Sequence, residues 1–218
     1  MKCSGNVVYL DNHLLIAEKK APLLTQPDGS SSESFQEEMM QFLKIKYQKP
    51  GNVFLHALHR LDKNVSGLVL FARTSKALIR LNEMMRLQAI ERIYIAEVEG
   101  ILEKEEGRLD HFLIHQEYRA VVAKEGSLEA KKARLYFKTL CKKEHSTVVQ
   151  IVLETGRYHQ IRAQFAAIGH PVRGDQKYGA QENKEAIFLF CHQIAFDHPV
   201  TKERVVASKS PWFFSGIK

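Results

Sequence analysis

Apolar residues recur along this chain with two periods, one typical of helices and one typical of strands. Residues 34–49, SFQEEMMQFLKIKYQK, show helical spacing and begin with Ser34 and Glu37, which match a capping box. The apolar positions of this predicted helix are Phe35, Met39, Phe42, Leu43 and Tyr47. Residues 75–88 predict a second amphipathic helix, with apolar positions at Leu78, Leu81, Met85 and Leu87.

Shorter apolar or alternating runs predict strands between these helices and after them. The expected strands cover residues 7–11, 14–20, 53–58, 66–74, 92–100, 133–141, 147–154, 186–196 and 204–208. The middle of the chain, residues 101–153, is expected to be mainly sheet. Strands and helices do not alternate regularly, which argues against a doubly wound parallel sheet. We therefore predict one α+β domain, residues 1–218, built on a mixed, mainly antiparallel sheet.

The charge and cysteine content narrow the class of protein. The 218 residues include 32 basic and 25 acidic residues, a formal net charge of +7 that favours polyanionic partners. Cys3, Cys141 and Cys191 are widely spaced and form no C-x-x-C pair, so neither a disulfide framework nor a cysteine zinc site is expected. No apolar run is long enough to span a bilayer, and the N-terminus lacks the features of a secretory signal. We expect a cytoplasmic protein.

A short polar break, HRLDKN, separates two of the apolar runs. Its aspartate, Asp62, is surrounded by His59, Arg60 and Lys63, and neighbouring cations favour an ionised carboxylate. Such a carboxylate can act as a nucleophile, a base or a metal ligand, but it can equally cap an ordinary turn. A protein kinase is excluded, because the order is not H-R-D-L and neither a D-F-G motif nor a glycine-rich phosphate loop is present.

Polar residues cluster in residues 154–179, ETGRYHQIRAQFAAIGHPVRGDQKYG, where a third helix is expected over residues 156–169 and ends at Gly169. If that helix begins near Arg157, its N-terminal amides and Arg157 can face an anion. Arg162 lies one turn further on, where partial burial would require a carboxylate partner. The alternative is a basic helix with a solvated face, which explains Arg173 and Lys177 easily and Arg162 less well. The polar residues of this segment are Arg157, His159, Gln160, Arg162, Arg173 and Lys177.

Tyr94 is the remaining candidate, on the strand RIYIAEVEG. Apolar residues flank it on both faces, as in a central strand, so a core position is one interpretation. A tyrosine beside a base-binding pocket would instead supply a stacking surface and a polar tip.

Four segments, taken in order, resemble the signature segments of RluA-type RNA pseudouridine synthases. They are HRLDKNVSGLVLFART, YIAEVEG, TGRYHQIRAQFAAIGHPVRGDQKYG and LFCHQIAFDHPVT, and VVYLDNHLLIAEKK resembles the opening strand pair of that family. The resemblance covers nearly the whole chain and is weakest over residues 107–143.

The resemblance implies a reaction and a role for each matching residue. Enzymes of this family break the bond between uracil and ribose, rotate the base and rejoin it through carbon, without a cofactor or metal. By motif position, Asp62 is the catalytic aspartate, Tyr94 packs against the target base and Arg162 pairs with the aspartate. Arg60 would fill the space left when the uridine flips out of the helix stack. Further RNA contacts are expected from Arg157, His159, Gln160, Arg173 and Lys177.

The chain departs from the usual family pattern at a few positions. Val65 replaces a threonine, Ala163 and Gln164 stand where a histidine is usual, and EKKAPLL replaces a Lys-Pro-Ala-Gly turn. No separate N-terminal RNA-binding domain is expected, because the first catalytic-domain strand starts near Val7. These departures leave the three proposed catalytic residues in place.

Two other functions remain open from the sequence. A non-catalytic RNA-binding protein could use the same basic surface, and a hydrolase with an aspartate nucleophile would need a second acid or base beside Asp62. The expected partner is RNA, either tRNA or rRNA. We expect the protein to be a monomer that does not bind a membrane.

Overall fold

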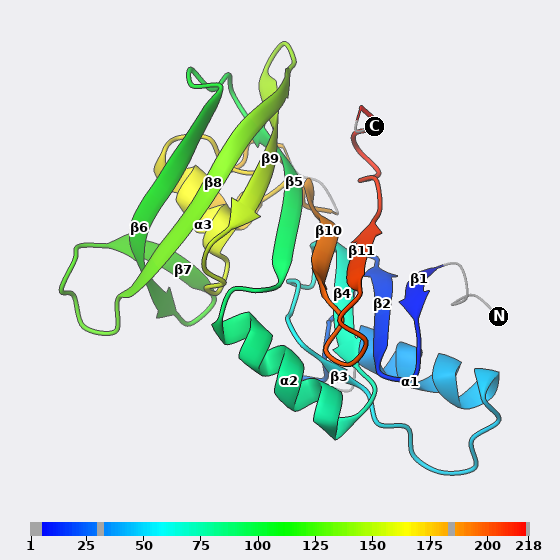
Figure 1. Ribbon diagram of the computed structural model, residues 1–218. Helices are drawn as coiled ribbons and strands as arrows, with labels where there is room; N and C mark the ends of the chain where they lie inside the picture. Colours follow the sequence, from blue (N-terminus) through cyan, green and yellow to red (C-terminus); the bar gives the residue numbers. More distant parts are fainter. Residues whose placement is uncertain (1–5, 30–32, 183–185, 217–218) are drawn as a thin grey trace. The chain divides into compact units, whose positions relative to one another are not determined.

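The computed structural model describes residues 6–29, 33–182 and 186–216 (Figure 1). These residues form two compact units, which are described separately. The first unit contains the described residues up to Glu91 and those from Cys191 onwards, and the second unit runs from Arg92 to Phe190. No helix in the described part of the chain is long and apolar enough to cross a membrane.

The first unit combines two helices with short antiparallel strands. Its elements are β1 (Val7–Leu10), β2 (Leu14–Lys19), α1 (Phe35–Lys46), β3 (His56–Ala57), β4 (Ser66–Ala72), α2 (Ser75–Arg86), the greater part of β10 (Leu189–Asp197) and β11 (Arg204–Ser208). Strand β2 pairs with both β1 and β4, β3 pairs with β4, and β10 pairs with β11, each time antiparallel. The order of strands is β1-β2-β4-β10, with β11 also on β10.

Local sequence signals explain the ends of the first elements. The Asp11 carboxylate accepts hydrogen bonds from the backbone N–H groups of His13 and Leu14, both at 2.7 Å, and so closes the turn between β1 and β2. The predicted capping box of α1 is confirmed, because Ser34 and Glu37 bond to each other's backbone N–H groups.

The core of the first unit lies between the helices and the sheet. Every residue of β4 is buried, and Phe35 of α1 packs against Phe71 of β4 with ring centroids 5.7 Å apart. The prediction of which residues form the apolar face of α2 is only partly correct. Leu81 is completely buried, but Leu87 is 72% exposed, because α2 ends at Arg86 and Leu87 lies beyond its last turn.

Gly67 allows β4 and β10 to approach closely. Its φ of +127° is unfavourable for residues with a side chain, and a Cβ atom placed there would lie 2.3 Å from the backbone nitrogen of Cys191. A glycine is therefore required directly after the Asp62 segment.

The second unit is an antiparallel sheet with one helix. Its elements are β5 (Glu91–Glu99), β6 (Glu106–Gln116), β7 (Arg119–Ala123), β8 (Lys131–Lys142), β9 (Ser146–Leu153), α3 (Gln160–Ala167) and a 3-10 turn (Gln176–Tyr178). The strand order is β5-β9-β8-β6-β7, and each neighbouring pair is antiparallel. Helix α3 packs against this sheet through Ala163, which contacts a cluster formed by Leu113, Ala120 and Ala133.

The predicted α+β fold with mainly antiparallel strands is confirmed, whereas several element boundaries were wrong, two of them beside the candidate site residues. Only His56–Ala57 of the strand expected at residues 53–58 forms β strand. Helix α3 begins at Gln160 rather than near Arg157. The side chain of Gln160 explains the later start, because its Oε1 accepts the N–H of Arg157 at 2.9 Å and holds residues 157–159 in a turn. The single catalytic domain stays a prediction.

Candidate active site

Asp62 lies in the loop between β3 and β4 in the first unit. Its side chain is half-buried, while Arg60 and Lys63 on either side are exposed. The backbone carbonyl of Asp62 accepts the N–H of Val65 at 3.0 Å, which makes a tight turn before β4. The loop therefore presents the carboxylate from a fixed backbone, with the exposed cations Arg60 and Lys63 near it in the sequence.

The segment that follows β2 holds this loop on both sides of Asp62. The Thr25 hydroxyl donates to the Leu61 carbonyl at 2.7 Å and accepts the Leu61 N–H at 3.0 Å. The Leu23 N–H donates to the Lys63 carbonyl at 2.9 Å. Further along, the Ser66 hydroxyl accepts the N–H of Ala21 at 3.1 Å. Backbone positions before and after Asp62 are thus anchored to a neighbouring segment, a condition for precise positioning of a reacting group.

Lys19, at the end of β2, is a residue near Asp62 that the sequence interpretation missed. Its side chain is completely buried. Burial lowers the pKa of Lys19 to about 8, while the Coulombic effect of Asp62 acts in the opposite direction. The sequence offered one signal, the replacement of the usual Lys-Pro-Ala-Gly turn by EKKAPLL, but not which lysine is buried.

Tyr94 lies in the middle of β5, in the second unit. It is only 5% exposed and pairs in register with Ile151 of β9. The expectation that this strand is apolar on both faces is confirmed by burial, since the residues from Tyr94 to Val98 are all buried. Burial of the ring is compatible with a core position and with one wall of a base pocket.

Arg162 forms a buried ion pair inside the second unit. Its Nε and Nη2 atoms lie 2.6 Å and 2.8 Å from the two carboxylate oxygens of Asp175, and its guanidinium lies over the Tyr178 ring at 5.0 Å. The expectation that a buried arginine needs a carboxylate is confirmed, and Asp175 supplies one. A guanidinium carries five N–H donors, so this pair fixes the plane of Arg162 and uses two of them.

The residues at the start of α3 and just before it have mainly structural contacts. Gln160 is buried, and besides accepting the Arg157 N–H its amide donates to the Arg134 carbonyl at 2.9 Å. His159 adopts a left-handed backbone conformation with φ of 50°, and its Nδ1 lies 3.0 Å from the Tyr178 hydroxyl. Arg157 is exposed, with Nε donating to the Lys132 carbonyl at 3.0 Å.

Arg173 and Lys177 are also tied into the second unit. Arg173 lies 2.8 Å from Glu97 and binds Glu182 with two nitrogens, at 2.9 Å and 3.0 Å. Hydrogen bonding to Glu182 and Glu97 outweighs desolvation and raises the pKa of Arg173. Lys177 donates to the Tyr118 carbonyl at 3.0 Å. Of these two cations, Arg173 is the one whose charge is offset by neighbouring carboxylates.

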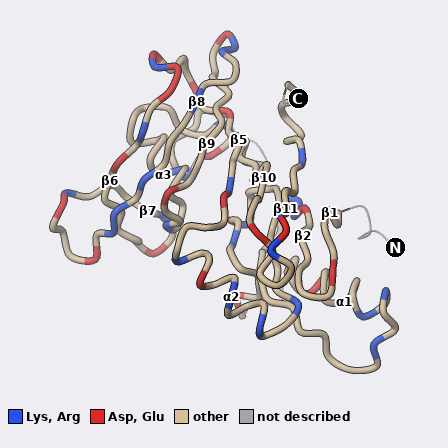
Figure 2. Tube along the Cα trace, viewed as in Figure 1, with Lys and Arg blue, Asp and Glu red and all other residues tan. Residues whose placement is uncertain are grey.

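Glu97 is the buried centre of this ion cluster. Lys143 and Ser146 bind it at 2.7 Å, in addition to Arg173. Burial alone would raise the pKa of Glu97, but hydrogen bonds from Lys143, Ser146 and Arg173 lower it overall. Figure 2 shows that acidic and basic residues are interspersed along the strands of this unit, so its excess positive charge is not confined to one element.

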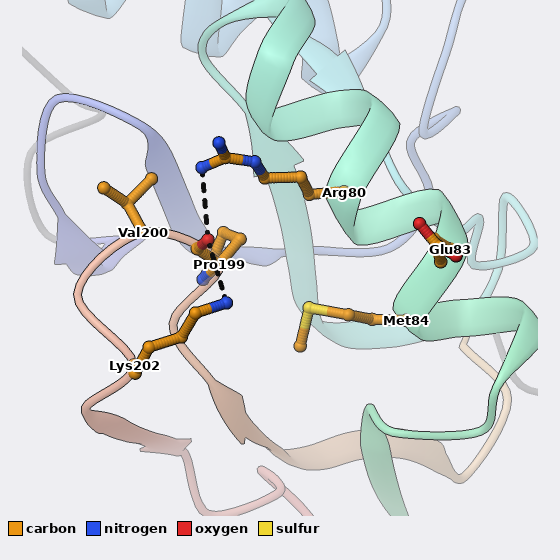
Figure 3. Close-up of a pocket in the computed structure, with 6 residues that line it drawn as sticks. All are labelled: Arg80, Glu83, Met84, Pro199, Val200 and Lys202. Atoms are coloured by element: carbon orange, nitrogen blue, oxygen red, sulfur yellow. Dashed lines mark hydrogen bonds between the residues drawn. The ribbon is translucent and has the colours of Figure 1, made fainter.

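The first unit also contains a hollow between α2 and the turn that joins β10 to β11 (Figure 3). Arg80 and Lys202 both donate to the Pro199 carbonyl there, at 3.2 Å and 3.4 Å. The hollow is lined by Arg80, Glu83, Met84, Pro199, Val200 and Lys202, so none of the residues expected from the sequence lies in it.

The predicted site residues are thus divided between the units. Asp62 and Arg60 belong to the first unit, whereas Tyr94, Arg162 and the other predicted RNA contacts belong to the second. In the described part of the chain, no three or more His, Cys, Asp or Glu side chains are grouped so that they could hold a metal ion.

Comparison with known proteins supports the interpretation of these motifs. The family model for RNA pseudouridylate synthase matches residues 13–167. The uncharacterized RNA pseudouridine synthase YhcT of Bacillus subtilis is 31% identical over 93% of this chain and 67% of its own length. The dual-specificity RNA pseudouridine synthase RluA of Pasteurella multocida is 31% identical over 95% of this chain and 94% of its own length.

A solved structure shows the same fold. Human RNA Pseudouridylate Synthase Domain Containing 4 matches with a TM-score of 0.80 and 19% identity, covering 97% of this chain and 90% of that chain. The chain belongs to the RNA pseudouridine synthase family and is of the RluA type. It is accordingly an isomerase that acts on RNA, as the resemblance implied.

Proposed function

We propose that this enzyme isomerises uridines in structured RNA, tRNA or rRNA, with Asp62 as the catalytic aspartate. The observation that carries this assignment is the anchoring of Leu61 and Lys63, which holds the intervening carboxylate on a fixed backbone. The carboxylate would act at the ribose, either by direct attack or by promoting loss of a ribose proton. The bond from the uracil nitrogen to ribose breaks, the base rotates, and a carbon–carbon bond replaces it.

Two residues of the second unit are proposed to complete the site. Tyr94 would pack against the flipped base, where an aromatic ring supplies a large contact area. Arg162 would pair with Asp62. The support for Arg162 is its bidentate bond to Asp175, which fixes the plane of a guanidinium, a group whose five N–H donors can serve more than one carboxylate.

RNA contacts are proposed for the exposed cations and for the segment around α3. Arg60 is exposed beside Asp62 and would occupy the gap left by the flipped nucleotide. Arg157 and Lys177 would contact phosphates, with His159 and Gln160 shaping the turn before α3. Arg173 is a weaker phosphate ligand in this proposal, because Glu97 and Glu182 already offset its charge. We propose a cytoplasmic monomer without a membrane partner.

The substrate is best identified in cells. Pseudouridine mapping of total RNA with and without the gene should reveal a site that is lost only in the deletion. Curated relatives include ribosomal large subunit pseudouridine synthases C and D and dual-specificity enzymes, which makes rRNA and tRNA the first RNAs to inspect.

The role of Asp62 is tested with purified protein. Asp62→Asn should abolish tritium release from uracil-labelled RNA while RNA affinity stays nearly unchanged, because affinity comes mainly from phosphate contacts. Asp197→Asn is the matched control, since that aspartate belongs to the same unit and its side chain is 65% exposed. Substantial turnover by Asp62→Asn would contradict the assignment. RNA binding without turnover in the wild type would indicate a binding protein, and free uracil a hydrolase.

A further inference from the structure

Four side-chain rings contact one another in series within the second unit. Tyr178 lies edge-on to His159, with ring centroids 5.6 Å apart, and His159 is stacked on Tyr158 at 3.8 Å with 19° between the planes. Tyr158 in turn lies 4.1 Å from His115, near the end of β6. The series therefore connects the turn before α3 to the hairpin formed by β6 and β7 (Figure 1).

The two ends of this series lie in different environments. At the buried end, the guanidinium of Arg162 lies over the Tyr178 ring at 5.0 Å. At the other end the rings reach the surface, because His115 is exposed and Tyr158 is 37% exposed. A base stacked on His115 would therefore be joined by an unbroken line of contacts to Arg162, the proposed partner of Asp62.

The hairpin turn beside His115 is fixed to the segment that follows α3. The Lys177 ammonium donates to the Tyr118 carbonyl at 3.0 Å. The Tyr178 hydroxyl accepts the N–H of Ala120 at 2.7 Å and lies 3.1 Å from the carbonyl oxygen of the same residue. These bonds hold the exposed rings in place before any RNA binds, so less conformational entropy is lost when a base stacks on them.

The charge around the exposed rings favours a polyanion. The hairpin turn, the turn before α3 and the 3-10 turn after it carry three basic side chains and one acidic side chain, all exposed. They are Arg119, Arg157, Lys177 and Glu117. The hairpin turn also carries Tyr118, which is 73% exposed. Exposed rings among cations are the combination that binds single-stranded RNA, because bases stack on the rings while the cations face phosphates.

We propose that His115 and Tyr158 form a stacking site for an unpaired nucleotide of the substrate RNA, distinct from the target uridine. The proposal rests on the proposed function, because Arg162 links this site to the reaction. It also narrows the class of substrate. A base inside a duplex has its faces covered by its neighbours, so the RNA must offer an unpaired nucleotide near the target, as a loop or a junction does.

Variants at one position separate stacking from other roles. His115→Ala removes the ring, whereas His115→Phe keeps a ring that has no hydrogen-bonding group. His145→Ala is the matched control, because this histidine belongs to the same unit, follows β8 and has a side chain that is 87% exposed. Urea unfolding of each variant shows whether the fold is retained.

The RNA probe is a stem–loop that contains the uridine identified by pseudouridine mapping. In matched copies, one unpaired nucleotide at a time beside this uridine is replaced by an abasic unit, which keeps the phosphate but removes the base. Dissociation constants and single-turnover rates are measured for every combination of protein and RNA. Each pair of changes then forms a double-mutant cycle, which isolates the contact between a ring and a base.

We expect one of the abasic positions to weaken binding by the wild type about tenfold. His115→Ala should lose the same affinity on the intact RNA and no more on that abasic RNA, because the base that the ring would contact is already absent. His115→Phe should bind within about twofold of the wild type, and His145→Ala should match it. The salt dependence of binding should be unchanged in His115→Ala, since no phosphate contact is removed.

Several results would overturn the proposal. If the losses from His115→Ala and from every abasic position multiply, the ring and those bases do not touch. If His115→Phe binds as weakly as His115→Ala, the histidine donates or accepts a hydrogen bond instead of stacking. A mapped uridine within a continuous duplex would also exclude the site. A wild type that binds RNA without turnover would instead contradict the proposed function, and the binding cycle would still report on stacking.

Discussion

Arg162 and Asp175 form a buried, bidentate ion pair that joins helix α3 to the loop after it. Both side chains are almost completely buried, and the two bonds measure 2.6 Å and 2.8 Å. Breaking a buried pair by removing one partner leaves an uncompensated charge, which costs much more than losing a pair at the surface. The proposed role of Arg162 towards Asp62 therefore depends on Asp175.

Asp175→Ala is expected to destabilise the protein by about 3–5 kcal/mol. Asp197→Ala is the control, because Asp197 lies 3.4 Å from Arg204 at the surface and its loss should cost less than about 1 kcal/mol. Urea unfolding at pH 7 measures both values. Equal effects of the two substitutions would show that the Arg162–Asp175 pair contributes no more than a surface contact.

Part of the fold and part of the site could be predicted from the sequence, because the residues that determine them are close together in the chain. The capping box needs only Ser34 and Glu37, which are three residues apart, and a buried arginine in an apolar helix predicts a carboxylate partner without naming it. The predicted start of α3 was wrong because the side chain of Gln160 accepts a hydrogen bond from the backbone N–H of Arg157. A hydrophobic pattern does not reveal such a bond.

The remaining contacts join residues that are far apart in the sequence. Lys19 and Lys63 are separated by 44 positions, and Glu97 and Arg173 by 76. Periodicity reports which face of an element is apolar, but it does not say which distant loop packs on that face. The tertiary structure was needed to find Lys19, whose ammonium binds the carbonyl of the residue after Asp62, and Glu97, the carboxylate bound by Lys143, Ser146 and Arg173.

Glu97 should make stability depend on pH in the acidic range. Its pKa is lowered in the folded protein, so the unfolded chain binds more protons near pH 4.5 and below. The stabilisation is present above the unfolded value of 4.5 and is lost as the pH falls through the lower, folded value. Glu97→Gln should cost about 1–3 kcal/mol at pH 7, and its difference from the wild type should shrink on acidification.

Urea unfolding at pH 7 and at about pH 3.5 tests this dependence. Glu144→Gln serves as the control, because the Glu144 side chain is 87% exposed, and it should follow the wild type at both values. A constant difference between Glu97→Gln and the wild type would mean that the cluster stabilises the fold without a contribution from the titration of Glu97.

Arg60 should matter most when the target uridine is stacked in a structured RNA. Flipping a stacked base costs a few kcal/mol, and an inserted arginine offsets part of that cost. An unstructured RNA has less stacking to replace. Arg60→Ala should therefore slow the reaction on a structured RNA by on the order of a hundredfold, and much less on a short unstructured analogue.

Single-turnover rates and binding on both RNAs, each at two salt concentrations, distinguish this role from a phosphate contact. A phosphate contact would weaken both RNAs alike and reduce the salt dependence of binding by about one unit. Arg86→Ala gives the baseline for removing an exposed arginine, since the Arg86 side chain on α2 is 78% exposed and pairs only loosely with Glu83 at 3.8 Å. Equal slowing on both RNAs with a reduced salt slope would make Arg60 a backbone ligand, because the benefit of filling a gap in the stack exists only where a stack is broken.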